Sequence, residues 1–101
     1  MNLAEELQNK RDERAAKLAV EVANKIKPLL HESASEGYTA YSIKITGEEK
    51  DKNLHVYANP KFIENLNLQL DGVKARFEDK FIESILGNGF GTHQYRIVFN
   101  W

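Results

Sequence analysis

The sequence contains no cysteine, and this absence excludes disulfide bonds, thiol catalysis and cysteine-ligated zinc together. A secreted domain of this size would often need disulfide cross-links, so we expect the protein to reside in the cytoplasm. No apolar run approaches the roughly 18 residues that a membrane span requires. The acidic N-terminus also lacks the basic and apolar segments of a signal peptide, and we therefore expect no contact with a membrane.

An excess of charge of either sign is missing as well. The chain has 14 Lys and Arg residues against 15 Asp and Glu residues, for a formal net charge of −1. A near-neutral balance provides no overall field to attract nucleic acid or an anionic membrane. Hydrophobic residues make up 42% of the chain and charged residues 29%, both near the average of globular proteins. We therefore expect one folded domain covering residues 1–101.

The first third of the chain is predicted to be a long helix, because apolar residues recur there at steps of three and four. Asn2 followed by Glu5 is the pattern of a capping box, and Gly37 is suited to end the helix. Pro28 interrupts the pattern and predicts a kink or a restart, since proline lacks the backbone N–H. The predicted buried stripe consists of Ala15, Leu18, Ala19, Val22, Ile26 and Leu29.

This predicted helix is long for a domain of 101 residues. Residues 3–27 alone would span about 37 Å at about 1.5 Å per residue, whereas such a domain has a radius of gyration of about 13 Å. Residues 8–14 contain no apolar side chain. We therefore expect residues 1–14 to project from the domain as a helical arm.

The remainder of the chain is predicted to contain four strands and a second helix. Asn59 and Pro60 open that helix, because asparagine is a preferred N-cap and proline fits the first helical position. Alternation of apolar and polar residues marks the strands, and residues 81–86 fit either a helical turn or an extended continuation. The expected strands are residues 38–46, 54–58, 73–78 and 94–101. The predicted fold class is α+β in the order α-β-β-α-β-β, with the long N-terminal helix and the second helix packed on a four-stranded antiparallel sheet.

The sequence offers no pattern typical of a catalytic or metal site. His31, His55 and His93 lack the spacing of metal ligands, and the serines lack the context of a nucleophile elbow. The acidic residues do not stand in an apolar setting that would raise their pKa for acid–base catalysis. We therefore expect no catalytic residue, no metal site and no cofactor.

A cationic ligand site is the one small-molecule site that the sequence suggests. Arg76 and Arg96 lie on the polar faces of two predicted strands, and arginine binds phosphate through a planar fork of donors. The glycine-rich residues 87–91 would let backbone N–H groups approach an anion, although a hairpin loop explains them more simply. Phe90 or Tyr57, the latter expected to point outward from its strand, would stack on a base. The predicted ligand-binding residues are Arg76, Arg96, Gly87, Gly89, Phe90, Gly91 and Tyr57.

Apolar and aromatic side chains in excess of what one thin core needs predict a contact surface for another protein. Trp101 fits either such a surface or burial at the edge of the core. The predicted interface residues are Leu3, Leu7, Leu18, Val22 and Trp101.

Three segments of the chain, together with its charged N-terminal helix, resemble small uncharacterised proteins carried by phages and prophages of Gram-positive bacteria. These segments are Gly37–Ile43, Leu70–Arg76 and Tyr95–Trp101. The resemblance covers most of the chain and implies an early, non-essential phage product in the cytoplasm of the bacterial host. That class includes inhibitors of host machinery and antagonists of host defence, and the resemblance assigns no functional residue.

Hypotheses from three classes of function follow from these observations. The leading one is a non-catalytic phage-type binding protein that blocks a host protein, a defence complex or a nucleoprotein complex. The alternative is a homo-oligomeric protein that binds or sequesters a nucleotide or another anion, and the third is an enzyme. A concave cationic pocket would favour the alternative, because a small ligand needs a pocket and a protein partner does not.

We expect the chain to form a homo-oligomer, most simply a homodimer, because a projecting helix and a thin core leave apolar surface to bury. Light scattering at micromolar concentration is expected to report about twice the chain mass of 11.6 kDa. A species of 11.6 kDa alone would contradict this expectation.

Overall fold

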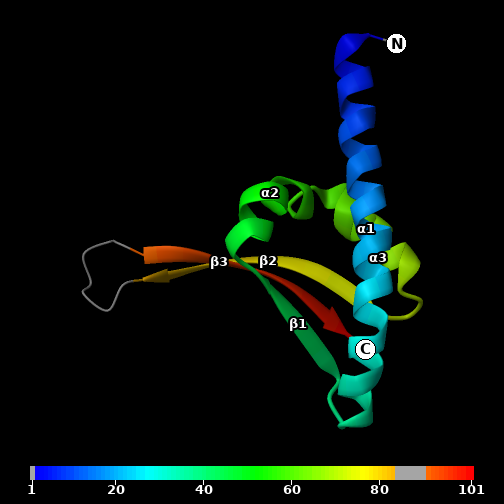
Figure 1. The fold of residues 1–101 in the computed structure, drawn as a ribbon, viewed down its shortest axis with the longest axis vertical. Helices are drawn as coiled ribbons and strands as arrows, with labels where there is room; N and C mark the ends of the chain where they lie inside the picture. The colour runs from blue at the N-terminus through cyan, green and yellow to red at the C-terminus, as the bar shows by residue number, and fades with distance from the viewer. Residues whose placement is uncertain (1, 84–90) are drawn as a thin grey trace.

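The computed structural model describes residues 2–83 and 91–101, which contain three helices and three strands (Figure 1). The elements in chain order are α1 (Leu3–Ser35), β1 (Ala40–Ile45), α2 (Gly47–Tyr57), α3 (Pro60–Gln69), β2 (Lys74–Glu83) and β3 (Gly91–Asn100). The strands form one antiparallel sheet in the order β1-β3-β2. The predicted α+β class is confirmed, whereas the fourth strand and the order α-β-β-α-β-β are wrong.

The helices pack on one side of the sheet. Apolar residues of the strands point to that side, and the core forms between them, α1 and α3. Ala15 and Ala19 of α1 are both 0% exposed, and their small side chains let α3 approach α1 closely. The largest fully buried side chains are Phe62 and Leu66 of α3 and Ile97 and Phe99 of β3.

The ends of α1 follow the predicted signals. The Asn2 side chain accepts a hydrogen bond from the Glu5 N–H at 2.9 Å, which caps the first turn. Gly37 adopts a φ of +95°, and its N–H donates to the Ala34 carbonyl at 3.0 Å. The Tyr38 N–H donates to the Ser33 carbonyl at 3.0 Å, which completes a Schellman motif. Both predicted ends are therefore confirmed.

Of the kink or restart predicted at Pro28, the restart is wrong, because α1 is one helix of 33 residues that continues through it. Proline removes the N–H that would bond to the carbonyl of Asn24, four residues earlier. Pro28 and Asn24 both lie on the exposed side of α1, where water can satisfy that carbonyl. The cost of the missing bond is therefore small enough for the buried side of α1 to hold the helix together.

The N-terminal part of α1 extends beyond the other elements (Figure 1). Residues 2–11 are all exposed, and Ala15 is the first buried residue of the helix. The molecule measures 50 × 42 × 21 Å along its principal axes, so it is thin for its length.

The expected strand at residues 54–58 is wrong, because this segment and the predicted loop before it form α2. The alternation of Leu54 and Val56 suggests a strand, but the buried residues are the adjacent pair Val56 and Tyr57. A strand would place two adjacent side chains on opposite faces, whereas a helix end can bury both. The i,i+4 ion pair of Glu48 with Lys52, at 3.3 Å, supports the helix on its exposed side.

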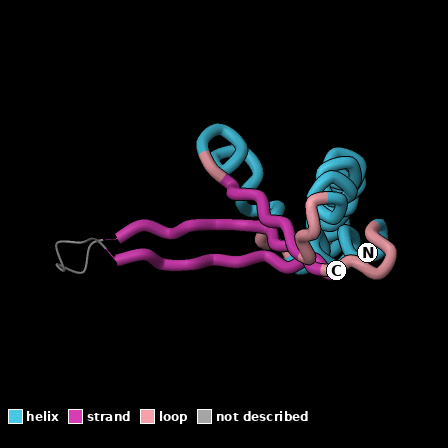
Figure 2. The backbone as a smooth tube through the Cα atoms, turned by 90° about the horizontal axis from the view of Figure 1, so that it is seen from below, coloured by secondary structure: helices cyan, strands magenta, loops and turns pink. Residues whose placement is uncertain are grey.

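β2 and β3 form a long hairpin that projects away from the helices (Figures 1 and 2). Its register runs from Lys74 opposite Asn100 to Glu83 opposite Gly91. Residues 81–83 are extended, while residues 84–86 lie outside the described part of the chain. Gly91 has no room for a side chain, since a Cβ there would collide with the Ile82 carbonyl oxygen and the Phe81 ring.

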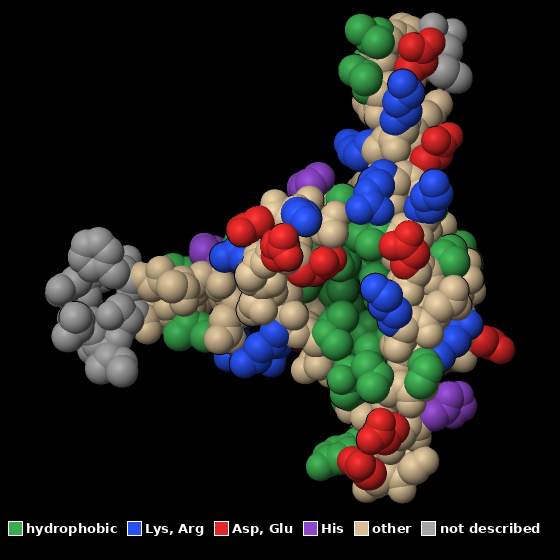
Figure 3. Space-filling model, viewed as in Figure 1, with side chains coloured by type: hydrophobic (Ala, Val, Ile, Leu, Met, Phe, Trp, Pro, Cys, Tyr) green, Lys and Arg blue, Asp and Glu red, His purple; other side chains and the backbone are tan. Residues whose placement is uncertain are grey.

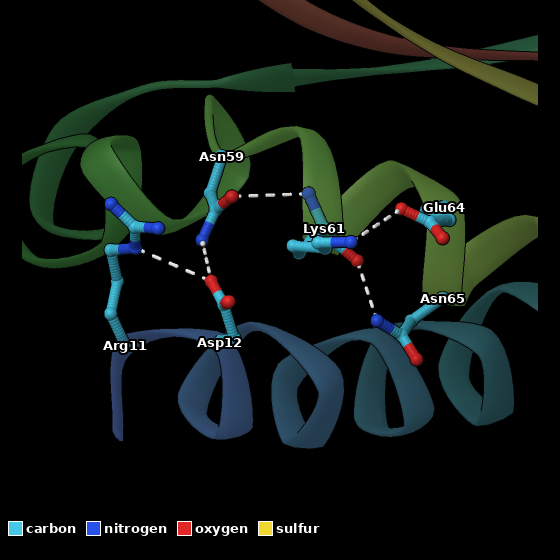
Figure 4. Close-up of polar contacts among 6 residues, drawn as sticks. All are labelled: Arg11, Asp12, Asn59, Lys61, Glu64 and Asn65. Atoms are coloured by element: carbon cyan, nitrogen blue, oxygen red, sulfur yellow. Dashed lines mark hydrogen bonds and ion pairs between the residues drawn. The ribbon is translucent and has the colours of Figure 1, made fainter. Parts of the chain in front are cut away.

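Asn59 connects α3 to α1 (Figure 4). Its Oδ1 accepts from the Lys61 N–H at 3.0 Å and caps α3, as predicted. Its Nδ2 donates to Asp12 Oδ1 at 3.4 Å, and Asp12 also pairs with Arg11 at 3.3 Å. The cap therefore also joins two helices that share the core.

We predict that Asn59→Ala lowers the free energy of unfolding by about 1 kcal/mol, because it removes the acceptor for an N–H group of the first turn. Urea denaturation measures this change. Asn59→Ser keeps a capping oxygen and is expected to recover most of the loss. If Asn59→Ala and Asn59→Ser unfold at the same urea concentration as the wild type, the cap does not stabilise α3.

Candidate functional site

The face of the sheet opposite the helices is covered by no described helix, and we call it the open face. Strand alternation and the observed register decide which side chains lie on it. They are Ala40, Ser42 and Lys44 of β1, Lys74, Arg76, Glu78, Lys80 and Ile82 of β2, and Thr92, Gln94, Arg96, Val98 and Asn100 of β3.

The open face is strongly cationic. Its charged residues are Lys44, Lys74, Arg76, Lys80 and Arg96, against the single carboxylate of Glu78. Within residues 2–83 and 91–101, none of the three lysines forms an ion pair. The whole chain has a net charge of −1, so the fold separates the charges of a near-neutral sequence.

Glu78 holds the two arginines of the open face together. Arg76 donates to its Oε2 through Nη2 at 2.8 Å and Nε at 3.1 Å, and Arg96 donates to Oε1 at 2.9 Å. The hydrogen bonds from Arg76, and then from Arg96, lower the pKa of Glu78 below its ordinary value. Among the described residues, the buried Nε of Arg96 has no partner. A hollow of about 260 Å³ lies between these groups and β1.

The predicted ligand residues do not converge on one point. Arg76 and Arg96 lie close together, but Gly91 stands opposite Glu83, seven residues along β2 from Arg76. At about 3.3 Å per residue this separation is roughly 23 Å, which is too far for one phosphate to contact both. The other predicted loop residues, Gly87, Gly89 and Phe90, lie outside the described part of the chain.

The outward position expected for Tyr57 is wrong. Tyr57 lies on α2 and is 5% exposed, because a helix rather than a strand turns it into the core. Its ring packs edge-to-face on Phe62, with centroids 5.0 Å apart, and its hydroxyl donates to Glu49. No ligand base can stack on a ring in this position.

A second surface is the groove between α1 and α2, which we call the α1–α2 groove. Figure 3 shows apolar side chains gathered in a hollow beside α1. The groove has a volume of about 330 Å³ and is lined by Leu18, Val22, Ile26, Leu29, Ile43 and Tyr57, with Arg14, Glu21, Lys25, Glu49 and Asn53 at its rim.

Hydrogen bonds at the groove rim connect α1 to α2. Arg14 donates to Asn53 Oδ1 at 3.0 Å, and Asn53 donates to Glu49 Oε1 at 2.9 Å. The Tyr57 hydroxyl donates to the same Glu49 oxygen. This bond, followed by that from Asn53, lowers the pKa of Glu49, while burial and then Glu49 raise the pKa of Tyr57. Glu49 is therefore ionised and Tyr57 protonated at neutral pH, which suits a structural network better than acid–base chemistry.

The predicted interface residues fall into different environments. Leu3 and Leu7 are 67% and 56% exposed on the projecting part of α1. Leu18 and Val22 are buried within the chain itself. Trp101 is partly exposed and lines an apolar cleft of about 360 Å³ between the C-terminal part of α1 and residues 70–73.

Lys44 and Lys80 lie on the open face but are not among the predicted binding residues. Lys44 lies on the polar side of a predicted strand, which was the available signal, whereas Lys80 lies beyond the predicted strand 73–78 and on the longer observed strand β2. Lys44 becomes a neighbour of Arg96 because β1 pairs with β3, two strands that are distant in the sequence. That pairing is a tertiary property, and the pattern of either strand alone does not reveal it.

Among residues 2–83 and 91–101, no group of three or more His, Cys, Asp and Glu side chains is placed to hold a metal ion. No described helix is long and apolar enough to cross a membrane. A scan of protein-family models found no match, and neither did searches of curated proteins and of solved structures.

We predict that Glu49→Gln lowers the free energy of unfolding by about 1 kcal/mol at neutral pH. The expected loss is below the usual range for hydrogen bonds to charged groups because Glu49 is exposed to solvent. Since the pKa of Glu49 is lowered in the folded protein, its stabilisation is present above the ordinary value of 4.5 and disappears as the pH falls below it.

Urea denaturation across this pH range tests that prediction. The difference between wild type and Glu49→Gln is expected to shrink at acid pH. The control is Glu48→Gln, which affects only the exposed pair with Lys52. A Glu49→Gln difference that does not change with pH would contradict the role of the ionised carboxylate.

Proposed function

We propose that this chain is a non-catalytic binding protein that attaches by its open face to an anionic surface of a macromolecular partner and blocks it. The partner class is a host protein or nucleoprotein complex, in keeping with the resemblance to phage products. The observation that carries the proposal is the concentration of five cations against one carboxylate on the uncovered side of the sheet.

The shape of the site supports a macromolecular partner over a small ligand. A three-stranded sheet presents a broad surface, about 10 Å across its strands, rather than an enclosed cavity. The one hollow between the arginines is adjacent to Glu78, whose carboxylate already takes hydrogen bonds from both guanidinium groups. A phosphate entering there would have to compete with Glu78, so the nucleotide-binding alternative has less support.

The Glu78 network also supports binding through the open face. Two guanidinium groups held by one carboxylate keep fixed orientations, and fewer side-chain rotations are lost when a partner binds. Arg96 is 30% exposed at its side chain and Arg76 is 56% exposed, so both retain donors that face solvent. The lysines around them add charge without a described ion pair.

We predict that the triple variant Lys44→Glu, Lys74→Glu, Lys80→Glu abolishes retention on a heparin column at low salt, while the wild type is retained. The reversed charges would repel the sulfated polymer from the open face. The matched control is Lys10→Glu, Lys17→Glu, Lys27→Glu, which makes the same change in net charge on α1.

The control is expected to elute only slightly earlier than the wild type. Circular dichroism melting verifies that both triple variants are folded. Equal loss of retention in the two folded variants would show that net charge, rather than the open face, determines binding, and would overturn the proposed function.

A further inference from the structure

We infer that the anionic partner surface is the sugar–phosphate backbone of a nucleic-acid duplex, with the described outer strand segments 80–83 and 91–94 of the β2–β3 hairpin facing its major groove. This inference rests on the proposed function and names the chemical class of the partner. It is carried by the spacing of the cations, by the position of the aromatic rings and by the shape of the hairpin.

Three cations of the open face lie in one row along β2. Lys74, Arg76 and Lys80 project from alternate positions of β2, with Glu78 between them. Two residues along a strand advance about 6.7 Å, so the row extends about 20 Å from Lys74 to Lys80. A duplex strand carries one phosphate per about 3.4 Å along its axis, so a row of cations about 20 Å long can contact several phosphates of such a polymer.

The aromatic rings of the sheet lie on the face away from these cations. Phe77, Phe81, His93 and Tyr95 occupy the alternate positions of β2 and β3. Proteins that bind single strands stack bases on aromatic side chains beside the cationic groove. Among the described residues, the open face offers no aromatic ring for such stacking. The open face therefore suits the backbone of a duplex better than unpaired bases.

The outer part of the hairpin has dimensions that suit a groove. Beyond the pair of Ile45 with Tyr95, where β1 ends, the sheet consists of β2 and β3 alone. A two-stranded ribbon fits the major groove, which is about 12 Å wide. Lys80, Thr92 and Gln94 lie on its open face. Lysine can pair with a phosphate, and threonine and glutamine can hydrogen-bond with base edges.

Side chains on the opposite face support this ribbon. The His93 ring stacks on Tyr95, with centroids 5.9 Å apart, and contacts the Phe81 ring at a tilted angle, with centroids 5.2 Å apart. Tyr95 also stacks on Phe77 at 6.1 Å. His93 Nδ1 lies 2.7 Å from Asp79 Oδ1. These contacts link the two strands across the hairpin, and they hold the polar side chains of the open face in register.

Fluorescence anisotropy with a labelled DNA duplex of about 20 base pairs, two helical turns, tests the inference. We expect the wild type to bind the duplex at least tenfold more tightly than the matching single strand. If about four phosphates are neutralised, affinity falls roughly a hundredfold between about 50 and 200 mM salt. Lys80→Ala is expected to reduce the slope of log affinity against log salt by about one. The control Lys17→Ala, on α1, is expected to leave it unchanged.

Competition by polyglutamate that carries the same number of charges as the duplex distinguishes this inference from the proposed function. Weak competition by polyglutamate supports a duplex partner. If polyglutamate competes as well as the duplex, or the single strand binds as tightly as the duplex, the partner is not a duplex. Absence of duplex binding with heparin retention intact overturns the inference alone. If the wild type neither binds the duplex nor is retained on heparin, the proposed function is overturned as well.

Discussion

The structure depends on the placement of β3 in the centre of the sheet. This C-terminal strand pairs with β1 on one side and β2 on the other, so it connects segments that are far apart in the sequence. Ile97 and Phe99 point from it into the core, where both are fully buried against the helices. Since strand side chains alternate, burial of these residues forces Arg96 and Val98 onto the opposite side. The apolar core and the cationic open face are therefore two consequences of one register.

A sheet that is covered on one face exposes the other face to water, and polar side chains usually occupy that exposed face. In this protein most charged side chains of the open face are cations, whereas most carboxylates lie on the helices and loops. Glu78 is the exception, and it joins Arg76 to Arg96 instead of neutralising the lysines. Exposed ion pairs contribute little to stability, so we interpret this network as a means of orienting donors. The same segregation of charge underlies both the proposed function and the inferred duplex partner.

Two carboxylates with lowered pKa values have different roles in this arrangement. Glu49 binds the buried Tyr57 and, through Asn53, the Arg14 side chain, so it stabilises the contact between α1 and α2. Glu78 lies on the surface proposed to bind a partner. Acidification is therefore expected to loosen the helical layer through Glu49 and to free the arginines through Glu78. The first effect concerns stability, and the second concerns binding.

The sequence by itself determined the local elements with strong signals, including both ends of α1, the Asn59 cap and the alternating faces of the strands. These depend on contacts within a few residues, which the sequence displays directly. It did not determine the helical state of residues 54–57, where a short apolar pattern fits a strand equally well and packing against α1 and the sheet decides. It indicated only the two arginines of the cationic face, Arg76 and Arg96, because strand alternation shows which side chains share a face but not which strands pair. Only the tertiary structure brought Lys44 beside Arg96, since the pairing of β1 with β3 joins segments about half the chain apart and follows from burial of the sheet as a whole.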